Sequence, residues 1–171
     1  HPERLAPDLD AVIVGMHARA DNPELARAQA LGLKVYSYPE FVFERCRHKQ
    51  RVVIAGSHGK TTITSMIMHV LRGLRLDFDY LVGAQVEGFE RTVRLSERAP
   101  IVLIEGDEYH TSPLDPRPKF LIYQPHIVVL SGIAWDHINV FPTETDYVAA
   151  FRALLEALPK AGAVVYNAED A

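Results

Sequence analysis

One short segment constrains the fold of this chain more than any other part of the sequence. It is a glycine-rich turn, placed between an apolar, β-branched run at 51–56 and a helical pattern at about 60–71. The segment reads Gly56, Ser57, His58, Gly59, Lys60, Thr61 and Thr62. A buried strand, a glycine turn and a helix N-terminus in this order are typical of a phosphate-binding loop. We therefore expect a parallel sheet with this loop at the carboxyl end of one strand.

Each part of the loop has a chemical purpose. Gly56 and Gly59 let the backbone bend so that successive N–H groups, including those of Ser57, His58 and Thr62, face phosphate oxygens. The helix N-terminus adds positive potential. Lys60 supplies a point charge to the β- and γ-phosphates, and the hydroxyl of Thr61 can ligate the Mg²⁺ that bridges them. The sequence thus predicts an ATP site at 56–62.

The loop departs from the general pattern at one position. The general pattern has a glycine five residues before Gly59, where this chain has Ile54. The loop is therefore a shortened variant, or else a chance Gly-Lys-Thr at a strand-to-helix turn. A phosphate-loop kinase or NTPase switch would need the longer form, so Ile54 argues against that class.

The rest of the chain alternates short apolar runs with helical patterns. Helices are expected from Asn22 to about Leu31, from Pro39, and from Thr143 to near Pro159. Strands are expected at 11–15, 33–36, 51–56, 78–82, 92–95, 101–104, 127–130 and 163–166. This alternation predicts an α/β fold with a mostly parallel sheet. A stretch with three prolines (Pro113, Pro116 and Pro118) is expected to be a loop.

Composition narrows the class of partner. The 171 residues are 48% hydrophobic and 23% charged, with a net charge of −4, which is typical of a globular protein and not of a strongly cationic nucleic-acid binder. Cys46 is the only cysteine, so an internal disulfide and a cysteine-rich zinc site are excluded. No apolar run approaches the ~20 residues of a membrane span. We expect neither a nucleic acid nor a membrane as partner, and the oligomeric state stays open.

Three motifs together resemble the Mur ligases, the ADP-forming amide ligases of peptidoglycan assembly. The family uses a shortened Gly-x-x-Gly-Lys-Thr loop, which accounts for Ile54. The acidic motif at 104–109 follows an apolar strand, and Asp136-His137 follows another, in the order that the family has them. The stretch at 15–24 resembles the end of the family's N-terminal, UDP-binding domain.

The resemblance also implies a domain organisation. Residues 1–48 are expected to be the C-terminal part of a Rossmann-like UDP-binding domain, with a boundary in the basic stretch at 45–51. Residues 49–171 are expected to be an incomplete ATP-binding central domain, with the family's C-terminal domain absent. Because the chain starts at His1 and not at Met, we expect a fragment, inactive alone, of a cytoplasmic enzyme.

The reaction that the resemblance implies has two steps. The γ-phosphoryl group of ATP passes to the carboxylate of UDP-N-acetylmuramate, and an amine then attacks the acyl phosphate. Two branches of the family use this acid: one adds L-alanine, and the murein peptide ligases of peptidoglycan recycling add L-alanyl-γ-D-glutamyl-meso-diaminopimelate. The segments at 105–109, 119–120 and 82–89 look more like the tripeptide-adding branch, since the other typically has Ser where Tyr109 stands.

The resemblance assigns catalytic roles to Lys60, Glu105 and His137, with Thr61, Glu105 and His137 as ligands of Mg²⁺. Glu105 ends a strand where open α/β sheets bind ligands, and a carboxylate suits Mg²⁺; by spacing alone it is equally a turn cap or an Arg partner. His137 alone would be an ordinary loop or core histidine. Six further residues are candidates for binding substrate: His17, Arg19, Gln85, Asp107, Glu108 and Tyr109.

Two departures from the family are visible. Ser131-Gly132 stands where Thr-Asn usually precedes the Asp-His motif, and Phe151 stands where some members carry a carbamylated lysine. The two branches that activate UDP-N-acetylmuramate also lack that lysine. An alternative of another class is a non-catalytic nucleotide-binding unit.

Overall fold

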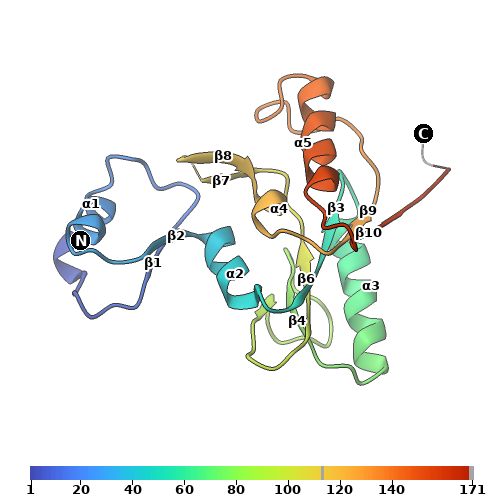
Figure 1. Ribbon diagram of the computed structural model, residues 1–171, viewed down its shortest axis with the longest axis horizontal. Helices are drawn as coiled ribbons and strands as arrows, with labels where there is room; N and C mark the ends of the chain where they lie inside the picture. The colour runs from blue at the N-terminus through green and yellow to red at the C-terminus, as the bar shows by residue number, and fades with distance from the viewer. Residues whose placement is uncertain (113, 170–171) are drawn as a thin grey trace.

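The computed structural model describes residues 1–112 and 114–169, and it has a small N-terminal unit beside a larger α/β part (Figure 1). The small unit contains a short 3₁₀ turn (η1, Pro2–Arg4), β1 (Val12–Val14), α1 (Pro23–Ala30) and β2 (Val35–Ser37), with β1 and β2 parallel. Helix α2 (Tyr38–Cys46) joins this unit to the larger part.

The larger part is built on a six-stranded sheet. Its strands are β3 (Gln50–Ala55), β4 (Phe78–Leu81), β5 (Val93–Arg94), β6 (Ile101–Glu105), β9 (Ile127–Leu130) and β10 (Ala163–Tyr166). The order is β10-β9-β3-β6-β4-β5, and every neighbouring pair is parallel except β4 with β5. The predicted mostly parallel α/β fold is confirmed. The strand that leads into the glycine turn, β3, lies in the middle of the sheet.

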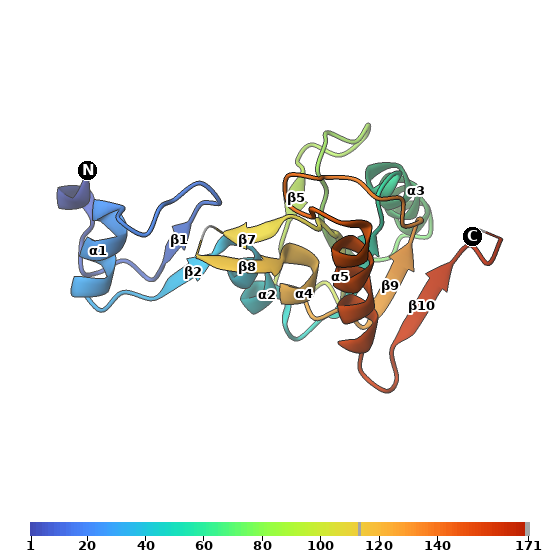
Figure 2. The same ribbon diagram turned by 90° about the horizontal axis from the view of Figure 1, so that it is seen from above.

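Helices cover both faces of this sheet, as Figure 2 shows from above. Helix α3 (Lys60–Gly73) packs on one face, whereas α2, α5 (Glu144–Glu156) and the short α4 (Lys119–Ile122) pack on the other. Alternate residues of β3 serve the two layers: Val53 and Ala55 belong to one core, and Ile54 belongs to the other. None of the helices in the described part of the chain is long and apolar enough to span a lipid bilayer.

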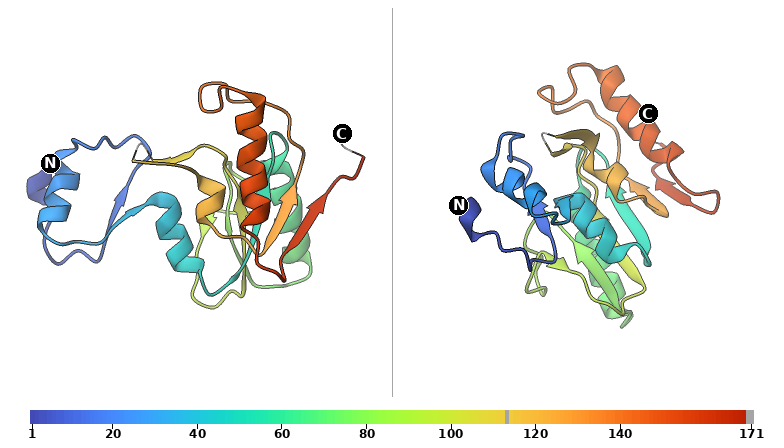
Figure 3. Two further views of the ribbon diagram at one scale, coloured as in Figure 1. Left: turned by 45° about the horizontal axis from the view of Figure 1, so that its top comes forward. Right: turned by 60° about the vertical axis from the view of Figure 1, so that its left-hand side comes forward.

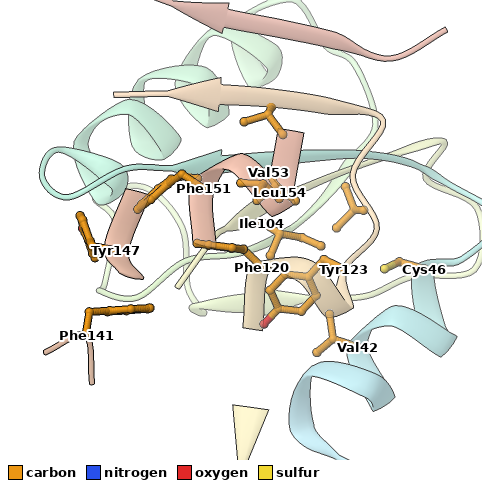
Figure 4. Packing of buried hydrophobic residues seen from close by; sticks show 13 residues of the cluster. Val42, Cys46, Val53, Ile104, Phe120, Tyr123, Phe141, Tyr147, Phe151 and Leu154 are labelled. Carbon is orange, nitrogen blue, oxygen red and sulfur yellow. The ribbon is translucent and has the colours of Figure 1, made fainter. Parts of the chain in front are cut away.

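The larger core is rich in aromatic side chains (Figure 4). Phe151 is fully buried, and its ring centroid lies 5.3 Å from that of Phe120 and 5.1 Å from that of Tyr147. The position where the resemblance would place a modified lysine is thus part of the apolar core.

The basic stretch at 45–51 is not a solvated linker. Cys46 is fully buried in the larger core together with Val42 of α2. The Lys49 ammonium is also buried, 2.8 Å from Asp79 Oδ2, and it donates hydrogen bonds to the carbonyls of Ser96 and Ala99. The buried face of α2 therefore belongs to the larger core. The left view of Figure 3 shows α2 between the small unit and the sheet. The division at residue 48 stays a prediction.

The proline-rich segment is more ordered than predicted. It forms two antiparallel strands, β7 (His110–Ser112) and β8 (Asp115–Pro118), followed at once by α4. The loop prediction was therefore wrong at Pro116 and Pro118, while Pro113 lies outside the described residues. An isolated two-stranded ribbon tolerates proline because each strand has a free edge, and the register is irregular between His110 and Ser112.

The amino ends of β3 and β9 are joined through a histidine. The N–H of Arg51 donates to His126 Nδ1 at 3.1 Å, and the N–H of His126 donates to the Arg51 carbonyl at 2.9 Å. Nδ1 must therefore be unprotonated. Burial, with the Arg51 guanidinium as a second cause, lowers the pKa of His126 below its ordinary value of 6.5.

This lowered pKa predicts a loss of stability in mild acid. The unfolded chain binds the His126 proton more tightly, so the contribution is fully present above pH 6.5 and falls as pH drops towards the folded-state pKa. Melting temperatures measured between pH 7.5 and 5.5 should fall less steeply in His126→Gln than in the unchanged chain. His69→Gln, on the exposed side of α3, is the matched control, and an equal slope in all three proteins would contradict the assignment.

Candidate functional site

The N-terminus of α3 differs from those of the other long helices. Side-chain oxygens cap three helices: Asn22 for α1, Ser37 for α2 and Thr143 for α5. The N-cap of α3 is Gly59, which has a left-handed backbone (φ 78°) and makes no side-chain cap. The first-turn N–H groups of a helix lack intrahelical acceptors. At α3 these donors are left for an anion, and the helix dipole adds to their attraction.

Gly56 brings the loop against the segment that follows β9. Its φ is 129°, and a Cβ atom there would lie 2.8 Å from the Gly132 carbonyl oxygen, 3.0 Å from the Ser131 nitrogen and closer still to Ser131 Oγ. The N–H of Ser57 donates to the Gly132 carbonyl at 3.0 Å. Ser131 Oγ donates in turn to the His58 carbonyl at 2.5 Å. Only glycine fits at position 56, for reasons of both conformation and space.

Lys60 folds back over this loop. Its ammonium donates to the carbonyls of Gly56 at 2.6 Å and Ser57 at 3.3 Å, and it forms an ion pair with Glu108 Oε2 at 3.0 Å. Glu108 is 1% exposed, yet its Oε2 has no aligned hydrogen bond. A buried carboxylate of this kind needs a cation beside it, so Lys60 neutralises Glu108 in this state.

Thr61 and Glu105 bring two oxygens together beside the loop. The Thr61 hydroxyl donates to Glu105 Oε1 at 2.8 Å, and Glu105 Oε2 accepts the N–H of Gly83 at 2.8 Å. Within the described residues, no cluster of three or more His, Cys, Asp or Glu side chains could hold a metal ion. A hydroxyl and one carboxylate still fit Mg²⁺, because this ion commonly takes one or two carboxylates and completes its octahedron with phosphate and water.

His137 lies against Glu108 and Tyr109. Its Nε2 is 3.0 Å from Glu108 Oε1, its Nδ1 is 3.0 Å from the Tyr109 hydroxyl, and the two ring centroids are 4.6 Å apart. Neither a hydrogen bond nor an ion pair joins His137 to Glu105 in the part of the chain that the structure describes. The expected ligand pair Thr61 and Glu105 is in contact, whereas His137 belongs to a neighbouring cluster with Lys60 and Glu108.

Sequence reasoning did not select Lys119 as a site residue. Its ammonium lies 2.5 Å from Asp107 Oδ2, and Asp107 Oδ1 accepts the N–H of Tyr109 at 2.9 Å. The pair is formed because the N–H of Lys119 donates to the Tyr109 carbonyl, which places α4 beside the acidic motif. The only signal in the sequence was the position of Lys119 in a stretch that resembles the tripeptide-adding branch.

Two hollows lie on either side of the loop. The first, of about 490 Å³, is bounded by Ser57, His58, the segment at 130–134, Tyr166 and Asn167. The second, of about 570 Å³, lies between the small N-terminal unit and the sheet. Its wall includes Ile13, Gly15, Met16, Tyr38, Lys60, Gly83, Glu105, Asp107 and Lys119. Lys60 and the two carboxylates therefore line the second hollow, whereas Ser57 and His58 of the glycine turn line the first.

The remaining candidates lie outside both hollows. His17 and Arg19 are on a loop of the small unit, where the Arg19 guanidinium pairs with Asp21 at 3.3 Å and both side chains are largely exposed. Gln85 is exposed and donates to the Phe89 carbonyl. The right view of Figure 3 shows that the small unit, which carries His17 and Arg19, stands beside the sheet.

A family model and curated relatives agree on the proteins to which this chain is similar. Residues 54–171 match the family model of the Mur ligase middle domain. The chain is 35% identical to a UDP-N-acetylmuramate–L-alanine ligase of Arthrobacter sp. (strain FB24), over 94% of this chain and 33% of the relative. It is 31% identical to a UDP-N-acetylmuramate–L-alanyl-γ-D-glutamyl-meso-2,6-diaminoheptandioate ligase of Haemophilus influenzae, over 98% of this chain and 37% of the relative.

Solved structures of such ligases are also similar to this chain. A UDP-N-acetylmuramate:L-alanyl-γ-D-glutamyl-meso-diaminopimelate ligase from Neisseria meningitides superposes with a TM-score of 0.83 and 30% identity, over 94% of this chain and 52% of that one. A murein peptide ligase from Psychrobacter arcticus shares the fold, with a TM-score of 0.79 and 24% identity over 96% of this chain and 37% of that one. The chain spans about a third of the length of the curated relatives it matches.

The close approach at Gly56 predicts that even a methyl group there is costly. Gly56→Ala should lower the free energy of unfolding by about 2 kcal/mol or more, because alanine disfavours this φ and its Cβ meets backbone atoms that cannot move freely. Urea denaturation provides the measurement. Gly73→Ala, where a Cβ would meet nothing within 4 Å and φ is not positive, is the control. Equal stability of the two variants would refute the steric argument.

Proposed function

Because the chain belongs to the Mur ligase family, we propose that residues 56–62 bind ATP and that the complete protein is an ATP-dependent, ADP-forming amide ligase acting on UDP-N-acetylmuramate. The observation that carries the proposal is that the loop contributes to two hollows, with Ser57 and His58 in the first and Lys60 in the second. A phosphoryl donor in one and an acceptor acid in the other would meet at Lys60. A purely nucleotide-binding unit would have no use for the second hollow.

The loop supplies the contacts that a triphosphate needs. N–H groups of the first turn of α3 would donate to phosphate oxygens, and the Lys60 ammonium would exchange the Gly56 carbonyl for a β- or γ-phosphate oxygen. This exchange replaces a neutral acceptor by a charged one, which is the stronger partner for an ammonium. Phosphoryl transfer depends on such charge neutralisation and on in-line placement more than on covalent catalysis.

Thr61 and Glu105 are the residues that would hold Mg²⁺. Mg²⁺ held there would supply positive charge that neutralises the charge developing on the transferred phosphoryl group. Thr61 lies in the first turn of α3, and Glu105 ends the neighbouring strand β6, so both side chains project from regular structure. His137 would act from the adjacent cluster, where it holds Glu108 together with Lys60.

The second hollow suits an acid joined to a larger nucleotide. Lys60 and Lys119 present two ammonium groups to it, and apolar residues of β1 and the following turn form the opposite wall. We assign the muramoyl carboxylate to the lysine side. Residues 1–48 would then carry the UDP part, with His17 and Arg19 near its phosphates, since a guanidinium suits bidentate phosphate contact.

The amine substrate is the finer part of the proposal. We favour the tripeptide L-alanyl-γ-D-glutamyl-meso-diaminopimelate because Tyr109, whose hydroxyl contacts His137, stands where the alanine-adding branch typically has Ser. L-Alanine is the second candidate, since the relatives of similar identity carry both names. Asp107 and Gln85 lie near the same side of the sheet and are assigned to substrate contact with Glu108.

Removal of the Lys60 charge should strongly weaken nucleotide binding. Lys60→Ala is expected to weaken the affinity of this chain for a fluorescent ATP analogue by about a hundredfold, because a charge-assisted contact to phosphate is lost. Lys160→Ala, an exposed lysine after α5, is the matched control. Binding retained in Lys60→Ala would remove the loop from the nucleotide site.

Glu105→Gln should change the dependence of ligation on Mg²⁺. In the complete protein, the Mg²⁺ concentration for half-maximal phosphate release is expected to rise about tenfold, because an amide oxygen is a weaker ligand than a carboxylate. Glu156→Gln, at the exposed end of α5, is the control. An unchanged Mg²⁺ titration would refute the assignment of Glu105.

One assay tests the reaction itself. The complete protein is given ATP, Mg²⁺ and UDP-N-acetylmuramate, with L-alanine in one series and the tripeptide in another, and phosphate release is followed. We expect release that depends on the amine and is faster with the tripeptide. Faster release with L-alanine would favour the second candidate, and no release with either amine would contradict the ligase proposal.

A further inference from the structure

A hydrogen bond that no motif predicts joins α5 to the phosphate loop. Tyr147, on the buried face of α5, donates its hydroxyl to Ser57 Oγ at 2.9 Å, across 90 positions of sequence. Tyr147 is fully buried and Ser57 is 8% exposed. Because Ser57 follows the close approach at Gly56, this bond acts on the part of the loop that has the least freedom.

The Ser57 hydroxyl is fully used by its three partners. It donates to the Ala134 carbonyl at 2.7 Å and accepts the Ala134 N–H at 2.7 Å. A hydroxyl has one donor and two acceptor positions, so the third partner, Tyr147, must be the donor. Ser57 Oγ is then saturated by protein groups and has no hydrogen to offer a phosphate.

The Tyr147 ring is held in place by its neighbours. Its centroid lies 5.1 Å from those of Phe141 and Phe151, in edge-on geometry with both (Figure 4). Burial raises the pKa of Tyr147 to about 12, so the hydroxyl keeps its proton at neutral pH. The Tyr147 hydroxyl is therefore held in a fixed position and keeps the proton that it donates to Ser57.

We propose that Tyr147 is a positioning residue for the nucleotide site: its hydroxyl fixes Ser57, and through Ser57 it locks the phosphate loop to the segment at 131–134. This segment forms one wall of the 490 Å³ hollow and leads to His137. The bond thus sets the loop before the nucleotide arrives, which lowers the ordering cost of binding. The proposal rests on the proposed function in one respect, namely that the loop binds nucleotide.

The first test is nucleotide binding by this chain. Tyr147→Phe keeps the ring and removes the hydroxyl, so the dissociation constant for a fluorescent ADP analogue should rise about three- to tenfold, the effect of one lost hydrogen bond. Ser57→Ala should weaken binding at least as much. The variant with both changes should bind the ADP analogue as tightly as Ser57→Ala alone, because both changes break the same connection.

Tyr80→Phe is the matched control. Tyr80 is 6% exposed in the core on the other face of the sheet, and its hydroxyl makes no hydrogen bond in the described residues. Its affinity should equal that of the unchanged chain. Melting temperatures of all variants are compared, since a purely structural role of Tyr147 would lower stability and leave affinity the same.

The second test does not need a nucleotide. Amide hydrogen exchange of the free chain should be faster at Ser57 and Ala134 in Tyr147→Phe than in Tyr80→Phe, because the Ser57 hydroxyl then loses one of its three partners. Unchanged affinity in Tyr147→Phe, or additive effects in the double variant, would overturn the proposal. If the unchanged chain binds no nucleotide, the proposed function fails, and the exchange result alone decides whether the connection exists.

Discussion

The contact between the phosphate loop and the chain after β9 is the constraint on which the rest of this structure depends. Gly56 brings the end of β3 so close to Ser131 and Gly132 that no side chain fits between them. The Ser57 N–H and hydroxyl then bond to the same segment. Since β3 is the middle strand, this contact sets the position of α3, of the loop and of both hollows.

Several charged side chains lie in and beside the second hollow. Lys60 pairs with Glu108, Lys119 pairs with Asp107, and His137 lies against Glu108, whereas Glu105 accepts hydrogen bonds from the Thr61 hydroxyl and the Gly83 N–H. Such pairs contribute little net stability, but removal of one partner leaves an uncompensated charge. A negatively charged substrate that took over Lys60 would leave Glu108 with His137 as its remaining partner.

The parts of the fold that could be predicted are those that depend on single residues or short stretches of sequence. The β-branched run at 51–56 and the glycines that follow specify the strand and the loop, because burial and positive φ are requirements of single residues. The pairing of Tyr147 with Ser57 and that of Lys119 with Asp107 are invisible in the sequence, because they depend on how the sheet brings distant segments together. Strand β8 was missed because proline is tolerated only where a strand has a free edge, and the sequence does not show that β7 and β8 form a separate two-stranded ribbon.

The central claim is that Lys60 and the first turn of α3 receive the phosphates of ATP between two hollows. A crystal structure of this chain with Mg²⁺ and a non-hydrolysable ATP analogue tests it most directly. We predict that the Lys60 ammonium leaves the Gly56 carbonyl for a β- or γ-phosphate oxygen, with the nucleoside in the hollow beside Tyr166 and Asn167. An analogue bound elsewhere, with Lys60 still paired to Glu108 and Gly56, would contradict the account.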